Sequence, residues 1–500
     1  MLRLRAAKRI PDHPFNAKSR SSHLMRQGMM QRTWSTLLRH AAFLGRRCGE
    51  NVIARRQADL PKRRKKPSGA KIMAVQVANT ALCPDVPGLP ECELYVELPE
   101  TGFEEPLSGL KQETLELVRR FAREVMRPEG IKLDRLSAEE MIAKGSSYWS
   151  VLEKHRALGL EAILTSDLSP TDLVDLQSMM SEELGWGDAG LGISIGASGL
   201  PQMMAMRWGR LDLLDAFPQP YVGCWGITEP VAGSDMLDWD RQAGHPQGSY
   251  DRPSLIATLK GDRVVLNGQK SAWVSNGVTA DVCILYTTFD RGQGREGICI
   301  FVDLRQKGVT RGKPLDKMGQ RCVPQGEIFF DNVEVPTRFI AAGPDRYTDA
   351  VYDILTEANS GMGTTFVGVA RAAYELALEY AHERRQGGVP IIHHQNVRYR
   401  LFHMLRRTEA ARALARRVAR FNAVSGKRAL QASICSKVTC TQTAFEVAND
   451  ALQMFGGNGM TRAYPLEKLL RDARAALIED GCNEILAIKA GSLLVNPDKA

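Results

Sequence analysis

Two adjacent acidic residues, Glu479 and Asp480, precede Gly481 near the C-terminal end of the sequence. They separate an apolar helical pattern that runs to Ile478 from a second one over 485–494. A turn between two helices can hold a carboxylate against a ligand, where it can act as a general base. Taken alone, a short acidic run more often solvates a loop. Two stretches upstream favour chemistry over solvation.

The first of these stretches is 224–235, Cys-Trp-Gly-Ile-Thr-Glu-Pro-Val-Ala-Gly-Ser-Asp. It leaves a helical region and enters a β-rich one, and the hydroxyls of Thr228 and Ser234 flank a glycine-containing turn. Such a turn can offer backbone N–H groups and hydroxyls to a flat heterocycle and to phosphate. An ordinary capped turn explains this segment equally well when it is considered by itself.

The second stretch is 267–276, Asn-Gly-Gln-Lys-Ser-Ala-Trp-Val-Ser-Asn. Side chains alternate along a strand, so we expect Trp273 and Ser275 on the same face of a strand. An indole beside a hydroxyl suits an aromatic ring with a polar edge. A buried tryptophan in a core is the alternative for this segment alone.

The hydrophobic periodicity predicts an α+β chain of several domains. Residues 105–218 show helical patterns: one run is expected to end at 128–130, Pro-Glu-Gly, and another begins with Ser169 as its N-cap. Residues 219–342 hold short β-branched and aromatic runs separated by turn signals, which predict an antiparallel β-barrel domain. Long helical patterns over 343–496, near 346–386, 393–424 and 430–455, predict a four-helix bundle.

Residues 1–104 form a basic leader and a proline-rich lead-in, which we expect to be disordered. Within the whole chain, 18 of the 66 Lys and Arg but only 3 of the 57 acids lie in residues 1–66, so the formal charge of +9 gives no support for a nucleic-acid partner. The leader resembles a mitochondrial transit peptide, or it is translated upstream sequence before a start at Met73. We therefore expect a cytoplasmic protein, with the mitochondrial matrix as the alternative.

Three further patterns exclude other classes of protein. No run of about 18 apolar residues exists, so no membrane span is expected. The 10 cysteines form no C-x-x-C pair and have no nearby histidine pattern, which predicts reduced thiols and no metal site. The G-x-G-x-x-G match at 292–297 is followed by a strand rather than a helix, so we interpret it as a hairpin loop and not as a nicotinamide site.

Five motifs in order make the chain resemble the acyl-CoA dehydrogenase flavoproteins over 105–495. They are T-E-P-x-x-G-S-D at 228–235, W-x-S-N at 273–276, Glu383-Arg384 with Gln395, Gln453-Met-Phe-Gly-Gly-Asn-Gly459, and Tyr464-Pro followed by Arg471-Asp-Ala. The resemblance implies that FAD is the cofactor. It also implies a homotetramer or homodimer of the acyl-CoA dehydrogenase-like fold.

By this resemblance, ten residues would bind the cofactor or the substrate. The flavin ring would be lined by Ile227, Thr228, Trp273 and Ser275, and Ser234 would lie near both the FAD pyrophosphate and the thioester. The rest of FAD would be held, partly across a subunit interface, by Arg384, Gln453, Gly456 and Gly457. Gly481 would contact the substrate.

The same resemblance gives Asp480 the position of the family's usual catalytic glutamate. Asp480 would remove the α-proton of an acyl-CoA thioester while flavin N5 accepts the β-hydride, leaving a 2-enoyl-CoA. The backbone N–H of Asp480 and a ribityl hydroxyl of FAD would stabilise the charge on the carbonyl oxygen. A dry site should raise the pKa of Asp480.

Several positions depart from the family pattern. Aspartate is one methylene shorter than glutamate, and family members with aspartate here include alicyclic acyl-CoA dehydrogenases, which suggests a ring-bearing or branched acyl group. The base of other branches aligns with Ala358, and Glu357 becomes an alternative base if the alignment shifts by one residue. Asn359 stands at a family arginine, Gly387 at an aromatic, and Cys482 and Glu484 at the usual Thr and Gln.

We therefore expect an FAD-dependent oxidoreductase of fatty acid metabolism that passes electrons to an electron-transferring flavoprotein. Two alternatives remain open: a flavin-binding scaffold subunit that oxidises nothing, and an acyl-CoA oxidase or eliminating enzyme.

Overall fold

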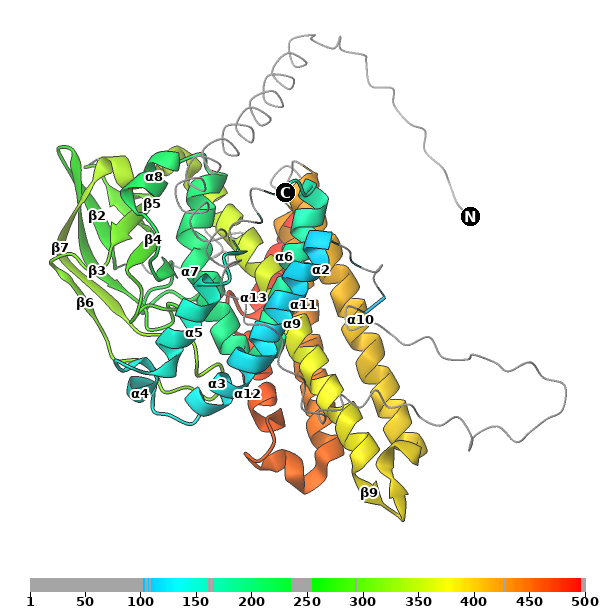
Figure 1. Ribbon diagram of the computed structural model, residues 1–500. Helices are drawn as coiled ribbons and strands as arrows, with labels where there is room; N and C mark the ends of the chain where they lie inside the picture. Colours follow the sequence, from blue (N-terminus) through cyan, green and yellow to red (C-terminus); the bar gives the residue numbers. More distant parts are fainter. Residues whose placement is uncertain are drawn as a thin grey trace, which may run out of the picture. The chain divides into compact units, whose positions relative to one another are not determined.

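Helix, sheet and helix follow one another along the chain in the computed structural model (Figure 1). The structure describes residues 102–103, 107, 109–160, 163, 166–234, 254–292, 295–425 and 429–495. Almost all of them belong to one compact unit, 98–160 with 167–500. The predicted leader up to residue 101 and Asp235, the last residue of the 224–235 motif, lie outside the described residues. The domain boundaries stay predictions.

The N-terminal helical part contains seven described α-helices, which are α2 (Gly109–Phe121), α3 (Arg127–Leu133), α4 (Ala138–Ile142), α5 (Ser147–Arg156), α6 (Pro170–Gly187), α7 (Ala189–Arg207) and α8 (Leu211–Ala216). Ser169 caps α6 as predicted, because its hydroxyl accepts the N–H of Asp172.

The expected stop at Pro128 is wrong. A π-helical turn, Ala122–Met126, joins α2 to α3, and α3 continues through Pro128 and Gly130 to Leu133. Proline lacks an N–H and crowds the carbonyl four residues earlier, but it is tolerated at the start of a helical segment. The wider π turn makes Pro128 the second residue of a new segment, so the helical path does not end there.

The middle part is one eight-stranded sheet with the path β6-β7-β3-β2-β4-β5-β8 and with β1 paired to β4. Its strands are β1 (Gly223–Gly226), β2 (Ile256–Lys260), β3 (Arg263–Lys270), β4 (Val282–Asp290), β5 (Arg295–Asp303), β6 (Val309–Arg311), β7 (Ile328–Pro336) and β8 (Ile340–Ala342). Most pairs are antiparallel as predicted, but β1 and β2 both pair with β4 in parallel. The predicted hairpin at 292–297 is confirmed, since β4 and β5 pair from Asp290 and Arg295 onward.

Long helices return after the sheet. They are α9 (Tyr347–Glu383), α10 (Gln395–Val424) and α11 (Leu430–Phe455), followed by the shorter α12 (Leu466–Ala476) and α13 (Asn483–Val495). A two-stranded hairpin, β9 (Arg385–Gln386) and β10 (Val389–Pro390), links α9 to α10. The three long helices pack on one another, α12 and α13 pack on α11, and α6 lies against α9 and α10 (Figure 1). This arrangement confirms the predicted fold class.

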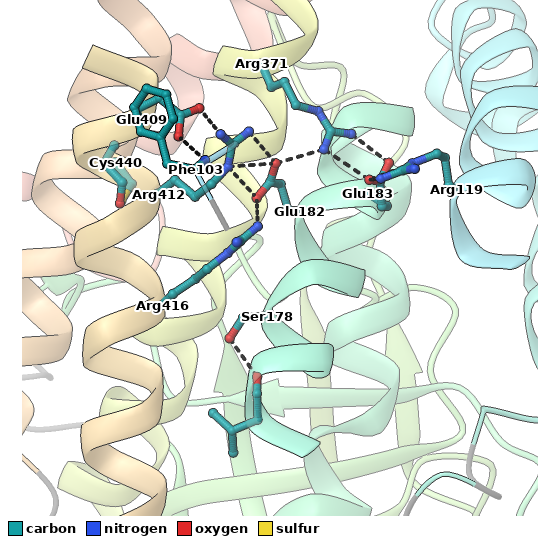
Figure 2. A network of polar contacts seen from close by, with 12 residues as sticks. Phe103, Arg119, Ser178, Glu182, Glu183, Arg371, Glu409, Arg412, Arg416 and Cys440 are labelled. Atoms are coloured by element: carbon teal, nitrogen blue, oxygen red, sulfur yellow. Dashed lines mark hydrogen bonds and ion pairs between the residues drawn. The ribbon is translucent and has the colours of Figure 1, made fainter. Parts of the chain in front are cut away.

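Buried charges cross-link α6 to α9 and α10 (Figure 2). Glu182 accepts hydrogen bonds from Arg371 at 2.8 Å, from Arg412 at 2.9 Å and from Arg416 at 3.0 Å. Glu183 accepts from Arg371 at 2.6 Å and from Arg119 of α2 at 3.1 Å. These contacts fix the register of four helices at once.

Two glycines let α6 and α9 approach closely. A Cβ at Gly368 would collide with the carbonyl oxygen of Glu182 and lie 2.6 Å from the backbone nitrogen of Trp186, and a Cβ at Gly185 would collide with the carbonyl oxygen of Thr365. Backbone atoms cannot move aside as a flexible side chain can. The contact therefore requires glycine on both helices.

We expect Gly368→Ala to lower the free energy of unfolding by about 1–3 kcal/mol, because it overpacks this contact. Gly361→Ala is the matched control in the same helix, where a Cβ would meet nothing within 4 Å. That variant should be neutral or stabilising by about 0.5–1 kcal/mol, because alanine loses less backbone entropy than glycine. Urea unfolding of both variants checks the pair, and equal effects would contradict the packing argument.

The described helices and cysteines indicate neither a membrane span nor a disulfide among the described residues. None of the described helices is long and apolar enough to cross a membrane. The seven cysteines in the described part are free thiols, and five of them are buried.

Candidate active site

The acidic turn between α12 and α13 has an unusual backbone. Asp480 has φ +50° and Gly481 φ +93°, and both values lie in the left-handed region. Aspartate enters this region more readily than most residues, and glycine enters it freely. Asp480 is half-buried, and its carboxylate and its backbone N–H have no hydrogen-bond partner among the described residues. Both groups are therefore available to a ligand.

The first upstream motif meets this turn directly. The Ser234 hydroxyl accepts the backbone N–H of Cys482 at 3.2 Å, across 248 positions of sequence. On the same motif, Thr228 and Ser271 share a hydroxyl–hydroxyl hydrogen bond of 2.8 Å. The structure thus brings Ser234 beside Gly481 and Asp480, and it fixes Thr228 against the end of β3.

A buried ion pair fixes the segment from Ile227 to Glu229 in place. Lys270 donates to the carboxylate of Glu229 at 2.7 Å and to the carbonyl of Ile227 at 3.0 Å, and the side chains of Lys270 and Glu229 are fully buried. Ile227 is itself buried. The pair holds the motif against β3, so the partly exposed Thr228 hydroxyl stays in place.

The strand predicted for 271–275 is wrong. β3 ends at Lys270, and the following residues form turns, with Ser275 in an isolated bridge to Gln325. Trp273 is 62% exposed rather than buried in a core. Gln325 nevertheless joins the two predicted residues, since its side-chain amide donates to Ser275 Oγ at 3.3 Å and to the Trp273 carbonyl at 3.4 Å. The contacts of Gln325, and not a shared strand face, therefore hold Trp273 and Ser275 near each other.

Two lysines, one from the loop between β6 and β7 and one from α11, lie close enough for their charges to act on the acidic pair. Lys317 donates to Gln325 Oε1 at 2.7 Å and to the Val323 carbonyl at 2.8 Å, and its charge acts on Glu479. Lys437 of α11 donates to the carbonyl of Gly481 at 2.8 Å. Sequence reasoning missed both lysines. Lys437 could have been noticed, because it stands on the helix face that buries Ile434, Thr441 and Ala444 at helical spacing.

Burial dominates the titration of both acids. It raises the pKa of Glu479 to about 7, against the opposing charge of Lys317. Burial also raises the pKa of Asp480, and Lys437 opposes that shift. Glu479 Oε2 and Gln320 Oε1 are buried oxygens without a described hydrogen-bond partner. A proton on Glu479 would remove the cost of burying a second negative charge beside Asp480.

The residues predicted to hold the rest of FAD lie at one end of the bundle. Arg384 ends α9, while Gln453 lies in the last turn of α11 and is followed by the turn Gly456–Met460. Tyr380 joins the two ends, because it stacks on Phe455 at 3.8 Å and accepts from Asn458 at 2.9 Å. Four of these residues, Arg384, Gln453, Gly456 and Gly457, are exposed. No described contact links them to the Asp480 turn of the same chain.

The positions that depart from the family pattern have physical explanations. Glu357 forms an ion pair with Arg207 of α7, so the alternative base is already partnered. Asn359 is fully buried and donates to the Leu355 carbonyl at 2.9 Å. Gly387 has φ +61° and Gly388 φ +86°, as a two-residue hairpin turn between β9 and β10 requires. An aromatic residue at 387 would strain that turn.

Comparisons with known proteins identify the family of the chain. Models of the acyl-CoA dehydrogenase middle domain and C-terminal domain match residues 224–333 and 351–491. Cyclohex-1-ene-1-carbonyl-CoA dehydrogenase of Geobacter metallireducens is 28% identical over 77% of this chain and 97% of its own length. A 3-(aryl)acrylate reductase of Clostridium sporogenes is 31% identical over 54% of this chain and 68% of its own.

Solved structures give the same result. Butyryl-CoA dehydrogenase from Megasphaera elsdenii matches with a TM-score of 0.68 and 25% identity over 79% of this chain and all of that one. A glutaryl-CoA dehydrogenase bound to glutaryl-CoA has the same TM-score and identity over 80% of this chain and 98% of its own. The chain belongs to the acyl-CoA dehydrogenase family, whose enzymes are flavoprotein oxidoreductases and typically homotetramers.

Proposed function

We propose that this chain oxidises the α,β-bond of an acyl-CoA thioester to a 2-enoyl-CoA, with Asp480 as the base. One observation carries the proposal. A half-buried carboxylate without a hydrogen-bond partner among the described residues is held on a left-handed turn next to Ser234. A general base needs such a position, because it must reach a substrate proton and not a protein donor.

The residues fit FAD as the cofactor. An exposed indole at Trp273 offers a ring face, and the partly exposed hydroxyls of Thr228 and Ser275 offer hydrogen-bond partners to a heterocycle edge. Arg384 and the glycine turn after Gln453 offer a cation and backbone N–H groups to phosphates. Because this second group lies at the far end of the bundle, a second copy of the chain would complete the site.

When bound, FAD supplies the acceptor for the hydride that leaves the β-carbon. The residues of the chain do the rest. The Asp480 carboxylate takes the α-proton, and its own backbone N–H is free to hold the thioester oxygen on which negative charge develops. Two C–H bonds break and one C=C bond forms, which is a two-electron oxidation of the thioester. Burial raises the pKa of Asp480, which makes it a stronger base toward a weak carbon acid.

Relatives guide the substrate class. Two of them, from Geobacter metallireducens and Syntrophus aciditrophicus, are named for a ring-bearing thioester, cyclohex-1-ene-1-carbonyl-CoA. The short aspartate leaves one methylene more room than glutamate for a bulky α-carbon. We therefore propose a ring-bearing or α-branched acyl group, with an electron-transferring flavoprotein as the electron acceptor.

Anaerobic mixing with an acyl-CoA panel tests the proposal. Flavin absorbance near 450 nm should bleach with at least one ring-bearing or branched ester, at a rate that a straight-chain ester of equal carbon number does not reach. Bound FAD that no ester reduces would favour the scaffold alternative. Rapid reoxidation by dioxygen after reduction would favour an oxidase.

We expect the purified protein to carry about one FAD per chain without a covalent bond, because the proposed site offers flavin a ring face, hydrogen-bond partners and a cation. Acid precipitation should release the flavin into the supernatant, where absorbance gives the ratio to protein. The matched pair is Arg384→Ala, which should lower FAD occupancy, and Arg398→Ala on α10, which should not. Protein that neither contains FAD nor takes it up would remove the dehydrogenase assignment.

A further inference from the structure

We propose that Lys437 is a positioning residue for Asp480: its ammonium holds the Asp480–Gly481 turn from within the bundle, and its charge keeps the base ionised. The inference rests on the proposed function, because Lys437 acts through Asp480 and not on the substrate.

Direct contacts support the structural half of this role. Lys437 is fully buried on α11 and donates to the Gly481 carbonyl at 2.8 Å and to Asn483 Oδ1 at 2.7 Å. Both partners are neutral oxygens. A buried ammonium is normally paired with a carboxylate, because an unpaired buried charge is costly. A structural clamp alone would not need a cation at this cost.

The contacts of Lys437 belong to a larger clamp on the turn. Asn483 opens α13 and donates through its side chain to Thr441 Oγ1 at 3.2 Å, and Thr441 donates to the carbonyl of Lys437 at 2.8 Å. On the other side, Ser234 accepts the N–H of Cys482. Asp480 is not a glycine, so its left-handed backbone is less favourable than an ordinary one and gains from surrounding contacts. Helix α11 therefore sets the direction in which Asp480 points.

Charge supports the second half of the role. Burial lowers the pKa of Lys437 to about 8, and the nearby acids Asp480, Glu479 and Glu484, with Cys482, oppose that shift. For Asp480, burial raises the pKa and Lys437 is the charge that opposes it, whereas Lys317 faces Glu479. Without Lys437, the pKa of Asp480 should rise, and the base would be protonated to a higher pH.

The test uses the flavin-loaded enzyme and a thioester that the parent oxidises. The flavin-reduction rate should increase with pH as the base loses its proton. In Lys437→Met and Lys437→Gln, the midpoint of this increase should lie about 1 pH unit or more higher than in the parent. Glutamine keeps a hydrogen-bond donor without the charge, so its shift isolates the electrostatic effect. Lys489→Met is the matched control, because it removes another buried lysine. Lys489 donates to the hydroxyl of Tyr352 on α9 at 2.9 Å, and its loss should leave the pH profile unchanged.

A second readout does not depend on turnover. The infrared carboxyl stretch that disappears in Asp480→Asn should titrate at higher pH in Lys437→Met than in the parent. An unchanged titration and an unchanged pH profile in folded, flavin-loaded Lys437→Met would overturn the electrostatic role.

If both Lys437 variants fail to fold, Asn483→Ala tests the positioning role, because it removes one of the two oxygens that hold the Lys437 ammonium and leaves the cation itself in place. Its flavin reduction should slow by about tenfold or more, and hydrogen exchange at the Cys482 amide should accelerate. Parental values for both would overturn the positioning role of Lys437. Failure of the proposed function would appear differently, as parental flavin reduction in Asp480→Asn.

Discussion

Asp480→Asn should reduce flavin about 10²-fold more slowly than the parent, or slower still, because the amide cannot accept the α-proton. The fold, FAD content and CoA-ester binding should persist. Asparagine is nearly isosteric with aspartate, and it adopts the left-handed backbone of residue 480, φ +50°, at least as readily. Single-turnover bleaching of the flavin, with ester affinity measured separately, checks the prediction. A parental rate would remove Asp480 as the base.

Glu479→Gln is the matched control for this prediction. It should cost far less, because burial raises the pKa of Glu479 to about 7, so the side chain already carries a proton for a large fraction of the time at neutral pH. If Glu479→Gln is the slower variant, the base is Glu479 and the alignment register is wrong by one residue.

Asp480→Glu tests whether the length of the side chain at position 480 is matched to the substrate. One more methylene should favour a straight-chain ester over a ring-bearing one, if the short side chain is matched to a bulky α-carbon. Glutamate adopts the left-handed region less readily than aspartate, so this variant should also be somewhat less stable. The ratio of flavin-reduction rates for the two esters is the measurement, and an unchanged ratio would contradict the match.

Glu182→Gln should lower the free energy of unfolding by about 3–5 kcal/mol near neutral pH, because it leaves buried arginines without their shared counter-charge. Arg371, Arg412 and Arg416 all contact Glu182, and all three are buried (Figure 2). Denaturant unfolding measures the loss. The matched control is Glu296→Gln, which breaks a half-exposed pair with Arg291 and should cost about 0–1 kcal/mol.

The same carboxylate predicts a pH dependence. Burial alone would raise the pKa of Glu182, but Arg412, Arg371 and Arg416 outweigh it and lower the pKa from 4.5 to about 2. A depressed folded-state pKa stabilises the protein above about pH 4.5, and the contribution disappears as the pH falls toward 2. The difference between parent and Glu182→Gln should therefore shrink over that range. A constant difference would contradict the assignment.

Local chemistry made much of the fold predictable. Helical periodicity located the three long C-terminal helices to within three residues at each end, and Ser169 began α6, because a hydroxyl at an N-cap satisfies its own helix end without distant contacts. The hairpin at 292–297 followed from the strands around it. Pro128 failed as a stop, because the π-helical turn before it makes Pro128 the second residue of a new helical segment, where a missing N–H is tolerated.

The sequence by itself determined the fold class, the family motifs and the acid that precedes Gly481, since residue types and spacing are carried by the chain. Only the tertiary structure decided how the site is built. It joined Ser234 to Cys482, replaced a predicted strand at Trp273 with a turn tied to Gln325, and placed Lys437 beneath the turn of Asp480. Each of these contacts joins residues at least 44 positions apart, and contacts between such distant residues follow from packing, which no local pattern encodes.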